Sequence, residues 1–317
     1  MRAAYLAQTI RAAEEPLLAS LPGVLMQRAA SGLASVLLRE LRGLRGAVHG
    51  ARVLVVAGAG NNGGDALFAG ARLLARGVAV TAWLTSERVH EAAWAAFRAA
   101  GGRQVDAVGA VAALGSIDLV VDGVLGIGGR AGLREPVALF ARACADAEVP
   151  VVAVDLPSGL DADQCGSVSP AAAGMTSSAT PGHPATAWPT SSTATPAPTV
   201  IPGLPRDLVG VGLPHFAAAR TVTFGGLKFC QVLEPAASAS GTVELVDIGL
   251  DLPEPDLRCW EPSDVAAVWP TPDASSDKYS RGVVGLDTGS DDYPGAAVLS
   301  TLGAVHAGAG MIRFAGA

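Results

Sequence analysis

The sequence is poor in charged and aromatic residues, and it lacks the features that mark several protein classes. Only 16% of its 317 residues are charged and 5% are aromatic, and the only lysines are Lys228 and Lys278. The net charge is -7 and no cluster of basic residues occurs, so we expect no nucleic-acid partner. No apolar run reaches the roughly 18 residues of a membrane-spanning helix, and the N-terminus lacks the order of a signal peptide, so we expect no membrane partner.

Cysteine and histidine are also scarce. The four cysteines form no CxxC pair, and the five histidines show no metal-ligand spacing. The sequence therefore predicts neither a disulfide framework nor a zinc site, and it favours a reduced, cytoplasmic compartment.

Half of the residues are hydrophobic, and short apolar runs alternate with helical patterns along the chain. Two helices are expected within 1–45, followed by strands at 52–58, 78–84, 118–126, 149–159, 220–226 and 242–250, and by helices at 65–77, 88–100 and 135–148. This alternation predicts an α/β fold with a doubly wound, mainly parallel sheet that helices cover on both faces.

Length alone suggests two domains. Residues 169–215 are rich in Pro, Ser, Thr and Ala and almost uncharged, which predicts a disordered insertion. We interpret 251–276 as a Pro-rich linker, and we expect 277–317 to form a strand, a Gly-rich turn, a helix and a strand. About forty residues are too few for a core of their own.

The strongest local motif is Gly58-Ala-Gly-Asn-Asn-Gly-Gly-Asp65, between a predicted strand and a predicted helix. Its glycines allow close backbone approach, and the helix N-terminus offers N–H groups to a phosphate. The formal match to the dinucleotide fingerprint is weak by itself, because the acidic residue that would hold the ribose, Glu87, comes late. The structural alternative is a tight turn in which Asp65 caps the helix.

Two further motifs follow strand ends. In the first, Asp122 precedes a Gly-rich loop that could cradle a phosphate or sugar, with Arg130 as a candidate phosphate partner. In the second, Asp155 follows four apolar residues and is a candidate general acid/base, and Ser158 adds a hydroxyl. The alternatives are an ordinary loop with a surface Arg130, and a turn capped by Asp155.

If the three strands are neighbours, the motifs converge. Asn62, Asp122 and Ser158 would then supply oxygen ligands from three strand ends. Oxygen ligands with a single carboxylate suit a hard, weakly held cation better than a transition metal.

Taken in order, GAGNNGGDA (58–66), VDGVLGIGGR (121–130) and VVAVDLPSGLDAD (151–163) resemble the NAD(P)H-hydrate epimerase (YjeF N-terminal) family. TVTFGGLK (221–228) is also similar to the family, although Phe229-Cys230-Gln231 replaces the Pro-Gly expected next. The resemblance covers about residues 1–250. The tail, 277–317, resembles the start of the ADP/ATP-dependent NAD(P)H-hydrate dehydratase, a ribokinase-like α/β domain.

The resemblance implies a Rossmann-like fold and an isomerase that interconverts the R and S epimers of hydrated NADH or NADPH (NADHX or NADPHX) in cofactor repair. It implies that Asp155 is catalytic, and that one K⁺ per subunit is held by Asn62, Asp122 and Ser158. The substrate-binding residues that it implies are Asn61, Asn62, Gly63, Gly64, Asp65, Gly126, Ile127, Gly128, Gly129, Arg130, Ala131, Gly132 and Asp155.

The whole chain resembles a bifunctional repair enzyme that is cut off early in its dehydratase domain. The resemblance would imply ADP or ATP as a cofactor only if that domain were complete. We therefore expect no dehydratase activity from this chain. A homo-oligomer is possible. Two other hypotheses stay open: an NAD-dependent oxidoreductase that uses the GxGxxG match, and a non-catalytic binding module on the same fold.

Overall fold

The computed structural model describes residues 1–164, 213–269 and 271–315. The chain divides into a larger unit, Arg2–Cys259, and a smaller unit, which comprises Met1 and Trp260–Ala317. Of the predicted insertion at 169–215, residues 169–212 lie outside the described residues. Residues 213–215 are described, and the Pro214 carbonyl accepts a hydrogen bond of 2.7 Å from the amide of Leu133.

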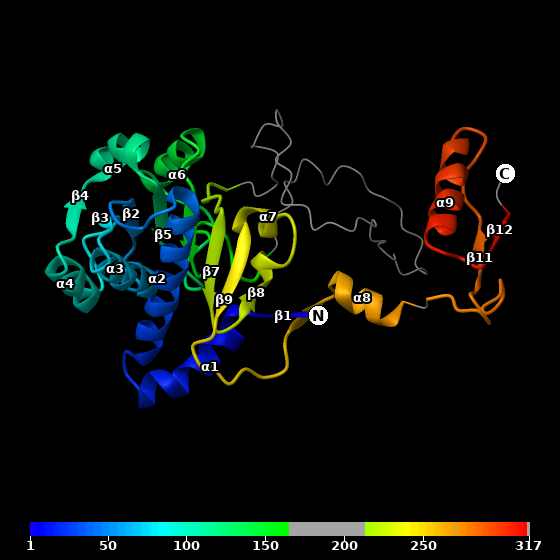
Figure 1. Ribbon diagram of the computed structural model, residues 1–317, viewed down its shortest axis with the longest axis horizontal. Coiled ribbons are helices and arrows are strands. Elements are labelled where there is room, and N and C mark those ends of the chain that lie inside the picture. The colour runs from blue at the N-terminus through cyan, green and yellow to red at the C-terminus, as the bar shows by residue number, and fades with distance from the viewer. Residues whose placement is uncertain (165–212, 270, 316–317) are drawn as a thin grey trace. The chain divides into compact units, whose positions relative to one another are not determined.

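The larger unit is built on a seven-stranded sheet in which every neighbouring pair is parallel (Figure 1). Across the sheet, the strands are β4 (Arg103–Val105), β3 (Ala79–Leu84), β2 (Arg52–Ala57), β5 (Leu119–Gly123), β6 (Val151–Val154), β7 (Arg220–Phe224) and β9 (Thr242–Val246). The chain runs outward from β2 to β4 and returns to the other side of β2 with β5. The doubly wound prediction is confirmed, and the strand order reverses between β2 and β5.

Helices cover both faces of this sheet. Alternate side chains of β2 point to opposite faces, so that Val53 and Val55 join one core while Leu54 and Val56 join the other. Helices α2 (Val24–Arg45), α3 (Asn61–Leu74) and α4 (Glu91–Ala99) supply the first core, and α5 (Ala107–Ala113) and α6 (Val137–Asp146) the second. A sheet buried on both faces explains why its strands are almost continuously apolar.

A smaller three-stranded sheet was not predicted. Here β1 (Arg2–Tyr5) pairs in parallel with β8 (Leu227–Lys228) and antiparallel with β10 (Leu257–Cys259). The expectation of two helices in 1–45 is therefore wrong for the first residues, because α1 (Ala7–Ser20) follows a strand. The predicted linker also contains β10. Strands of two to four residues are too short to show a period, and pairing with distant segments creates them.

Some other boundaries also differ from the prediction. Strand β4 and helix α5 were not expected, and α3 begins at Asn61, four residues before the predicted start. The short elements η1 (Leu114–Ser116), η4 (Phe229–Gln231) and α7 (Ala236–Ser240) complete the larger unit.

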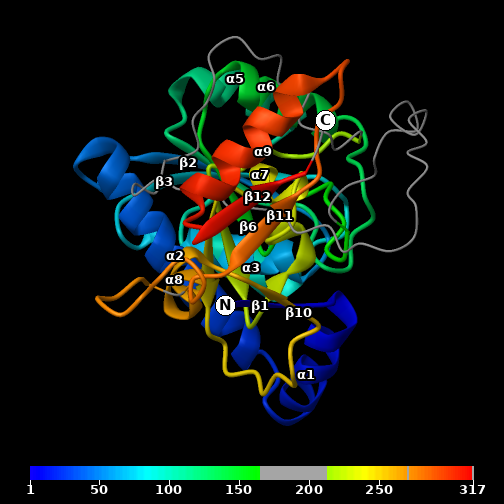
Figure 2. The ribbon, with the colours of Figure 1, turned by 90° about the vertical axis from the view of Figure 1, so that its right-hand side faces the viewer.

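The smaller unit contains α8 (Pro262–Val268), β11 (Val283–Leu286), α9 (Pro294–His306) and β12 (Met311–Phe314). The predicted order of strand, turn, helix and strand is confirmed, and β11 pairs with β12 in parallel (Figure 2). No residue of α9 is buried, and Leu299 is 72% exposed. This unit therefore has little apolar core within the described residues.

Among the described helices, none is by itself long and apolar enough to cross a membrane. Helices α1 and α2, bent by 115° at their junction, satisfy the length and composition test only as a pair.

Candidate functional site

The three glycine- and aspartate-containing motifs meet at the carboxyl edge of the parallel sheet. In the sheet register Val56 lies beside Asp122, and Asp122 lies beside Ala153, so β2, β5 and β6 are consecutive strands. The loops that follow them leave the sheet where the strand order reverses. Open α/β sheets bind ligands in the crevice at this point.

Asp122 and Ser158 form a buried hydrogen-bonded pair in this crevice. The Ser158 amide donates to Asp122 Oδ2 at 2.8 Å, and the Ser158 hydroxyl donates to Asp122 Oδ1 at 2.6 Å. Asn62 joins the pair through the backbone of Leu125. Its Nδ2 donates to the Leu125 carbonyl at 3.0 Å and to the Val154 carbonyl at 2.7 Å, while the Leu125 amide donates to the Ser158 hydroxyl at 2.8 Å. These contacts hold the loops after β5 and β6 and the start of α3 together.

The Asp122 carboxyl is completely buried, and no Lys or Arg of the described residues forms an ion pair with it. Burial raises its pKa to about 6, although hydrogen bonds from Ser158 and Val124 lower it in part. A buried carboxylate beside a serine hydroxyl, with no basic partner in the described residues, supplies oxygen donors of the kind that a hard cation takes.

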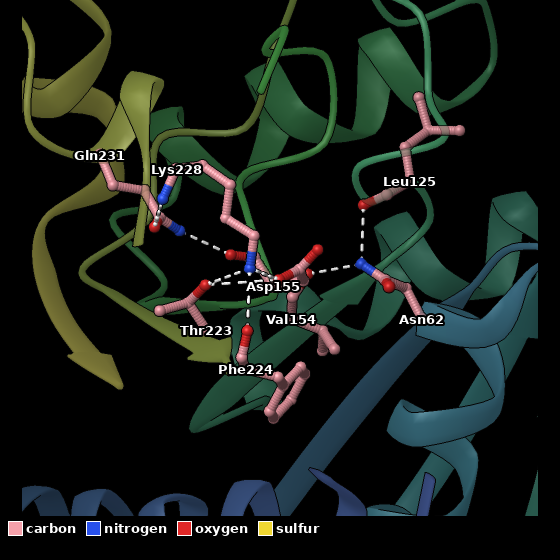
Figure 3. Close-up of polar contacts among 8 residues, drawn as sticks. All are labelled: Asn62, Leu125, Val154, Asp155, Thr223, Phe224, Lys228 and Gln231. Atoms are coloured by element: carbon pink, nitrogen blue, oxygen red, sulfur yellow. Dashed lines mark hydrogen bonds and ion pairs between the residues drawn. The ribbon is translucent and has the colours of Figure 1, made fainter. Parts of the chain in front are cut away.

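Asp155 lies directly after β6 and is held at both its side chain and its backbone (Figure 3). Lys228 forms an ion pair with Asp155 Oδ1, and the hydroxyl of Thr223 donates to the same oxygen at 3.3 Å. Gln231 Nε2 donates to the Asp155 carbonyl at 2.6 Å. Asp155 has a φ of +70°, and in the described part of the chain only one other non-glycine residue, Glu148, has a positive φ. Such a conformation persists only where its surroundings enforce it, and it often marks a functional site.

Asp155 opens onto a cleft of about 1080 Å³ between the sheet edge and helices α1, α2 and α3. Three more carboxyl groups line the same cleft: Glu14 of α1, Asp65 of α3 and Asp247, which follows β9. Burial, reinforced by the charge of Asp155, raises the pKa of Glu14 and of Asp65, that of Asp65 well above its usual value. Within the described residues, Asp65 Oδ1 is buried without a hydrogen-bond partner. An acidic cleft of this size can hold a small molecule and exchange protons with it.

Comparison with known proteins shows the family of the chain. The model of the YjeF-related protein N-terminus matches residues 22–187. The chain belongs to this family. It is 40% identical to an NAD(P)H-hydrate epimerase of Microbacterium testaceum, over 84% of this chain and 85% of that protein.

It is also 45% identical to the bifunctional NAD(P)H-hydrate repair enzyme Nnr of Mycobacterium leprae. That match covers the whole chain but only 56% of the relative, so the chain spans little more than half the length of this bifunctional protein. Among solved structures, yeast YNL200c matches with a TM-score of 0.51 and 19% identity, over 76% of this chain and 86% of that one. This likeness supports the Rossmann-like fold.

Not all the substrate-binding residues that the family resemblance implies line the cleft. Asn61, Asn62, Asp65, Ile127 and Asp155 do. The others lie outside it, namely Gly63, Gly64, Gly126, Gly128, Gly129, Arg130, Ala131 and Gly132. The roles of these residues in binding stay predictions.

The glycines of the first motif have a packing role that the sequence did not reveal. A Cβ atom at Gly63 would lie 2.1 Å from the Gly58 carbonyl oxygen, and one at Gly58 would lie 2.0 Å from that of Val124. Asp65 is not the cap of α3, since the helix begins at Asn61 after Gly60. The alternative of a helix-capping Asp65 is therefore wrong.

Four polar residues around Asp155 were not among the predicted site residues: Glu14, Thr223, Lys228 and Gln231. Lys228 carried a signal, since it is one of only two lysines and ends a family-like segment. Gln231 stands where the sequence departs from the family pattern, and it bonds to the Asp155 backbone. Glu14 carried no signal, because an acidic residue in an amphipathic helix is ordinarily solvent-exposed.

Proposed function

We propose that this chain is an NAD(P)H-hydrate epimerase that interconverts the R and S epimers of NADHX or NADPHX. The observation that carries the proposal is the Asp155 carboxyl, fixed at the end of a parallel strand and opening onto a large cleft. The 40% identity with a relative of that name, over most of both chains, supports the same reaction.

The chemistry requires a group that both takes and gives a proton. The hydrate carries a hydroxyl on C6, next to the ring nitrogen. If the hydroxyl is protonated, it leaves as water while the nitrogen lone pair forms a double bond to C6, and water returns to either face with loss of a proton. If instead the hydroxyl loses its proton, the C6–N bond breaks, the nitrogen takes up a proton, and the ring closes again on either face. Asp155 is positioned to carry the proton in both routes.

The N-terminus of α3 provides a suitable place for the phosphates of the substrate. Asn61 and Asn62 form the first turn of this helix and line the cleft. The unpaired N–H groups of a first turn and the helix dipole favour an anion. We propose that these groups and the loop 126–132 hold the pyrophosphate while Asp155 faces the nicotinamide ring.

We further propose that Asn62, Asp122 and Ser158 hold one K⁺ ion per subunit. The complete burial of the Asp122 carboxyl, without a basic partner in the described residues, supports a cation there. When bound, K⁺ would supply positive charge beside the phosphate loops. The hydrogen bonds between Asp122 and Ser158 join the loops after β5 and β6, and Asn62 connects these loops to α3.

The test is an epimerisation assay on pure R-NADHX, followed by chromatography, with and without K⁺. We expect the S epimer to appear, with a higher rate in K⁺ than in tetramethylammonium. Replacing Asp155 by Asn should abolish turnover and leave the circular dichroism spectrum unchanged. Unaltered turnover in Asp155→Asn would remove Asp155 from the mechanism.

The same assay separates the alternatives. An oxidoreductase would transfer hydride from intact NADH, and a binding module would bind the hydrate without converting it. The structure gives the oxidoreductase little support, because Glu87 is exposed and does not line the cleft. The absence of dehydratase activity stays a prediction, which ADP- or ATP-dependent recovery of NADH from the S epimer would contradict.

A further inference from the structure

Lysine side chains are rarely buried, but the side chain of Lys228 is. Its side chain is 1% exposed, and it is the only Lys or Arg among the buried residues of the described chain. Removing an ammonium group from water is costly unless charged and hydrogen-bonding partners replace the water. Because this burial is costly and the chain contains only two lysines, we expect Lys228 to have a functional role.

The ammonium group of Lys228 has three partners, and all lie around Asp155 (Figure 3). It forms the ion pair with Asp155 Oδ1, and it donates to the hydroxyl of Thr223 at 2.7 Å and to the carbonyl of Phe224 at 3.2 Å. These contacts use the three donors of an ammonium group. They fix one oxygen of Asp155, and Oδ2 accepts no hydrogen bond from the described residues.

Lys228 also helps to hold the backbone of Asp155. The amide of Lys228 donates to Gln231 Oε1 at 2.9 Å, and Gln231 Nε2 donates to the Asp155 carbonyl. Lys228 itself is anchored in β8, where it pairs with Tyr5 of β1. The small sheet thus fixes both the side chain and the left-handed backbone of Asp155.

The other charged groups around this pair come from several elements. Glu14 faces it from α1 and Asp65 from α3, and Arg11 acts on Glu14. Arg28 of α2 and Asp247, after β9, also line the cleft, and Cys230 follows Lys228 in η4. Asp161 and Asp163 act on Cys230, and His90 lies farther along the cleft. Burial favours the neutral forms of Glu14 and Asp65, whereas Asp155 alone of the three carboxyls is bonded to Lys228. When neighbouring carboxyls lie in contrasting environments, one can be ionised and act as a base while the others stay neutral.

We propose that Lys228 is the positioning residue for the proton transfer: its ammonium group holds one oxygen of Asp155 and turns the free oxygen of that carboxylate toward the cleft. Asp155 then begins the reaction as a base, which selects the route that starts with loss of the hydroxyl proton. This inference rests on the proposed epimerase function.

The first experiment tests the ion pair without any activity. In protein labelled with ¹³C and ¹⁵N only at lysine, the side-chain NMR spectrum contains two ammonium signals, and Lys278→Met assigns them. Lys278 is exposed and lies in the smaller unit, so its signal should resemble that of free lysine. We expect the Lys228 signal to be shifted and slow to exchange, and to move in Asp155→Asn. A Lys228 signal that Asp155→Asn leaves in place would overturn the proposal, even if Lys228 variants do not fold.

The second experiment follows the pH dependence of epimerisation in Lys228→Met, with Lys278→Met as the matched control. We expect kcat to fall by about 100-fold or more in Lys228→Met. Because the buried carboxylate loses its countercharge, the acid limb of the kcat profile should move up by about one pH unit or more. The control should keep the wild-type rate and profile.

A folded Lys228→Met with a kcat within about threefold of wild type, or with an unmoved acid limb, would refute the positioning role. A wild-type chain without epimerase activity would instead refute the proposed function, and the NMR result would still stand. The two failures are therefore distinguishable.

Discussion

The buried Asp122 should make the stability of this protein fall as the pH rises. Its pKa is raised from 3.8 to about 6 in the folded state, with burial as the main cause. One pKa unit corresponds to about 1.4 kcal/mol, so ionising Asp122 costs about 3 kcal/mol more in the folded protein than in the unfolded chain. Its contribution to stability is therefore fully present below pH 3.8 and is lost as the pH rises through about 6.

The assay is urea unfolding of wild type and Asp122→Asn between pH 4 and 8, in a buffer free of K⁺. The variant loses hydrogen bonds that the carboxylate accepts from Ser158 and Val124, which lowers its stability by an amount that does not depend on pH. Asp65 and Glu14 also titrate, but they do so in both proteins and cancel in the difference. Part of the full effect is already lost at pH 4, so we expect the wild type to lose about 2.4 kcal/mol relative to the variant across this range.

A difference between the two proteins that stays constant from pH 4 to pH 8 would refute the reasoning. A second arm tests the cation. If K⁺ binds beside ionised Asp122, adding it at pH 8 should raise the free energy of unfolding of the wild type by mass action, and should leave Asp122→Asn unchanged. An equal response of both proteins would refute a cation site at Asp122 while leaving the pH prediction intact.

Three further predictions concern packing, the smaller unit and thiol reactivity. Gly63→Ala should lower the free energy of unfolding by about 2 kcal/mol, because its Cβ meets a carbonyl oxygen at 2.1 Å; Gly60→Ala, with no neighbour within 4 Å, is the control for the same urea titration. Removing residues 271–317 should leave the epimerisation rate unchanged, since no cleft residue comes from the described part of that segment; a large loss would show that the smaller unit is needed. Burial raises the pKa of Cys144 and of Cys230 to about 12, so iodoacetamide at pH 8 should label half-buried Cys259 before either of them, as peptide mass spectrometry would show. Faster labelling of Cys144 would contradict its burial.

The sequence was most informative where a long apolar run is followed by a polar residue. Such runs identified six of the seven strands of the parallel sheet, and the polar residues at or just after their ends, such as Asp122 and Asp155, lie at the predicted edge. Short elements escaped this reasoning. β1 and β8 owe their existence to pairing with each other, and four residues of sequence contain no trace of a partner more than 200 residues away.

The sequence by itself determined the doubly wound sheet, the order of its motifs and the resemblance to the NAD(P)H-hydrate epimerase family, because periodicity and strand-end chemistry are local properties. Only the tertiary structure decided which groups surround Asp155. Glu14, Asp65 and Lys228 come from segments far apart in the chain, and the folded protein alone sets their distances and burial. The protonation of a carboxyl depends on those two quantities. The glycines of the first motif illustrate the same division: their spacing is visible in the sequence, but the carbonyl that forbids a side chain at Gly63 is placed there by the fold.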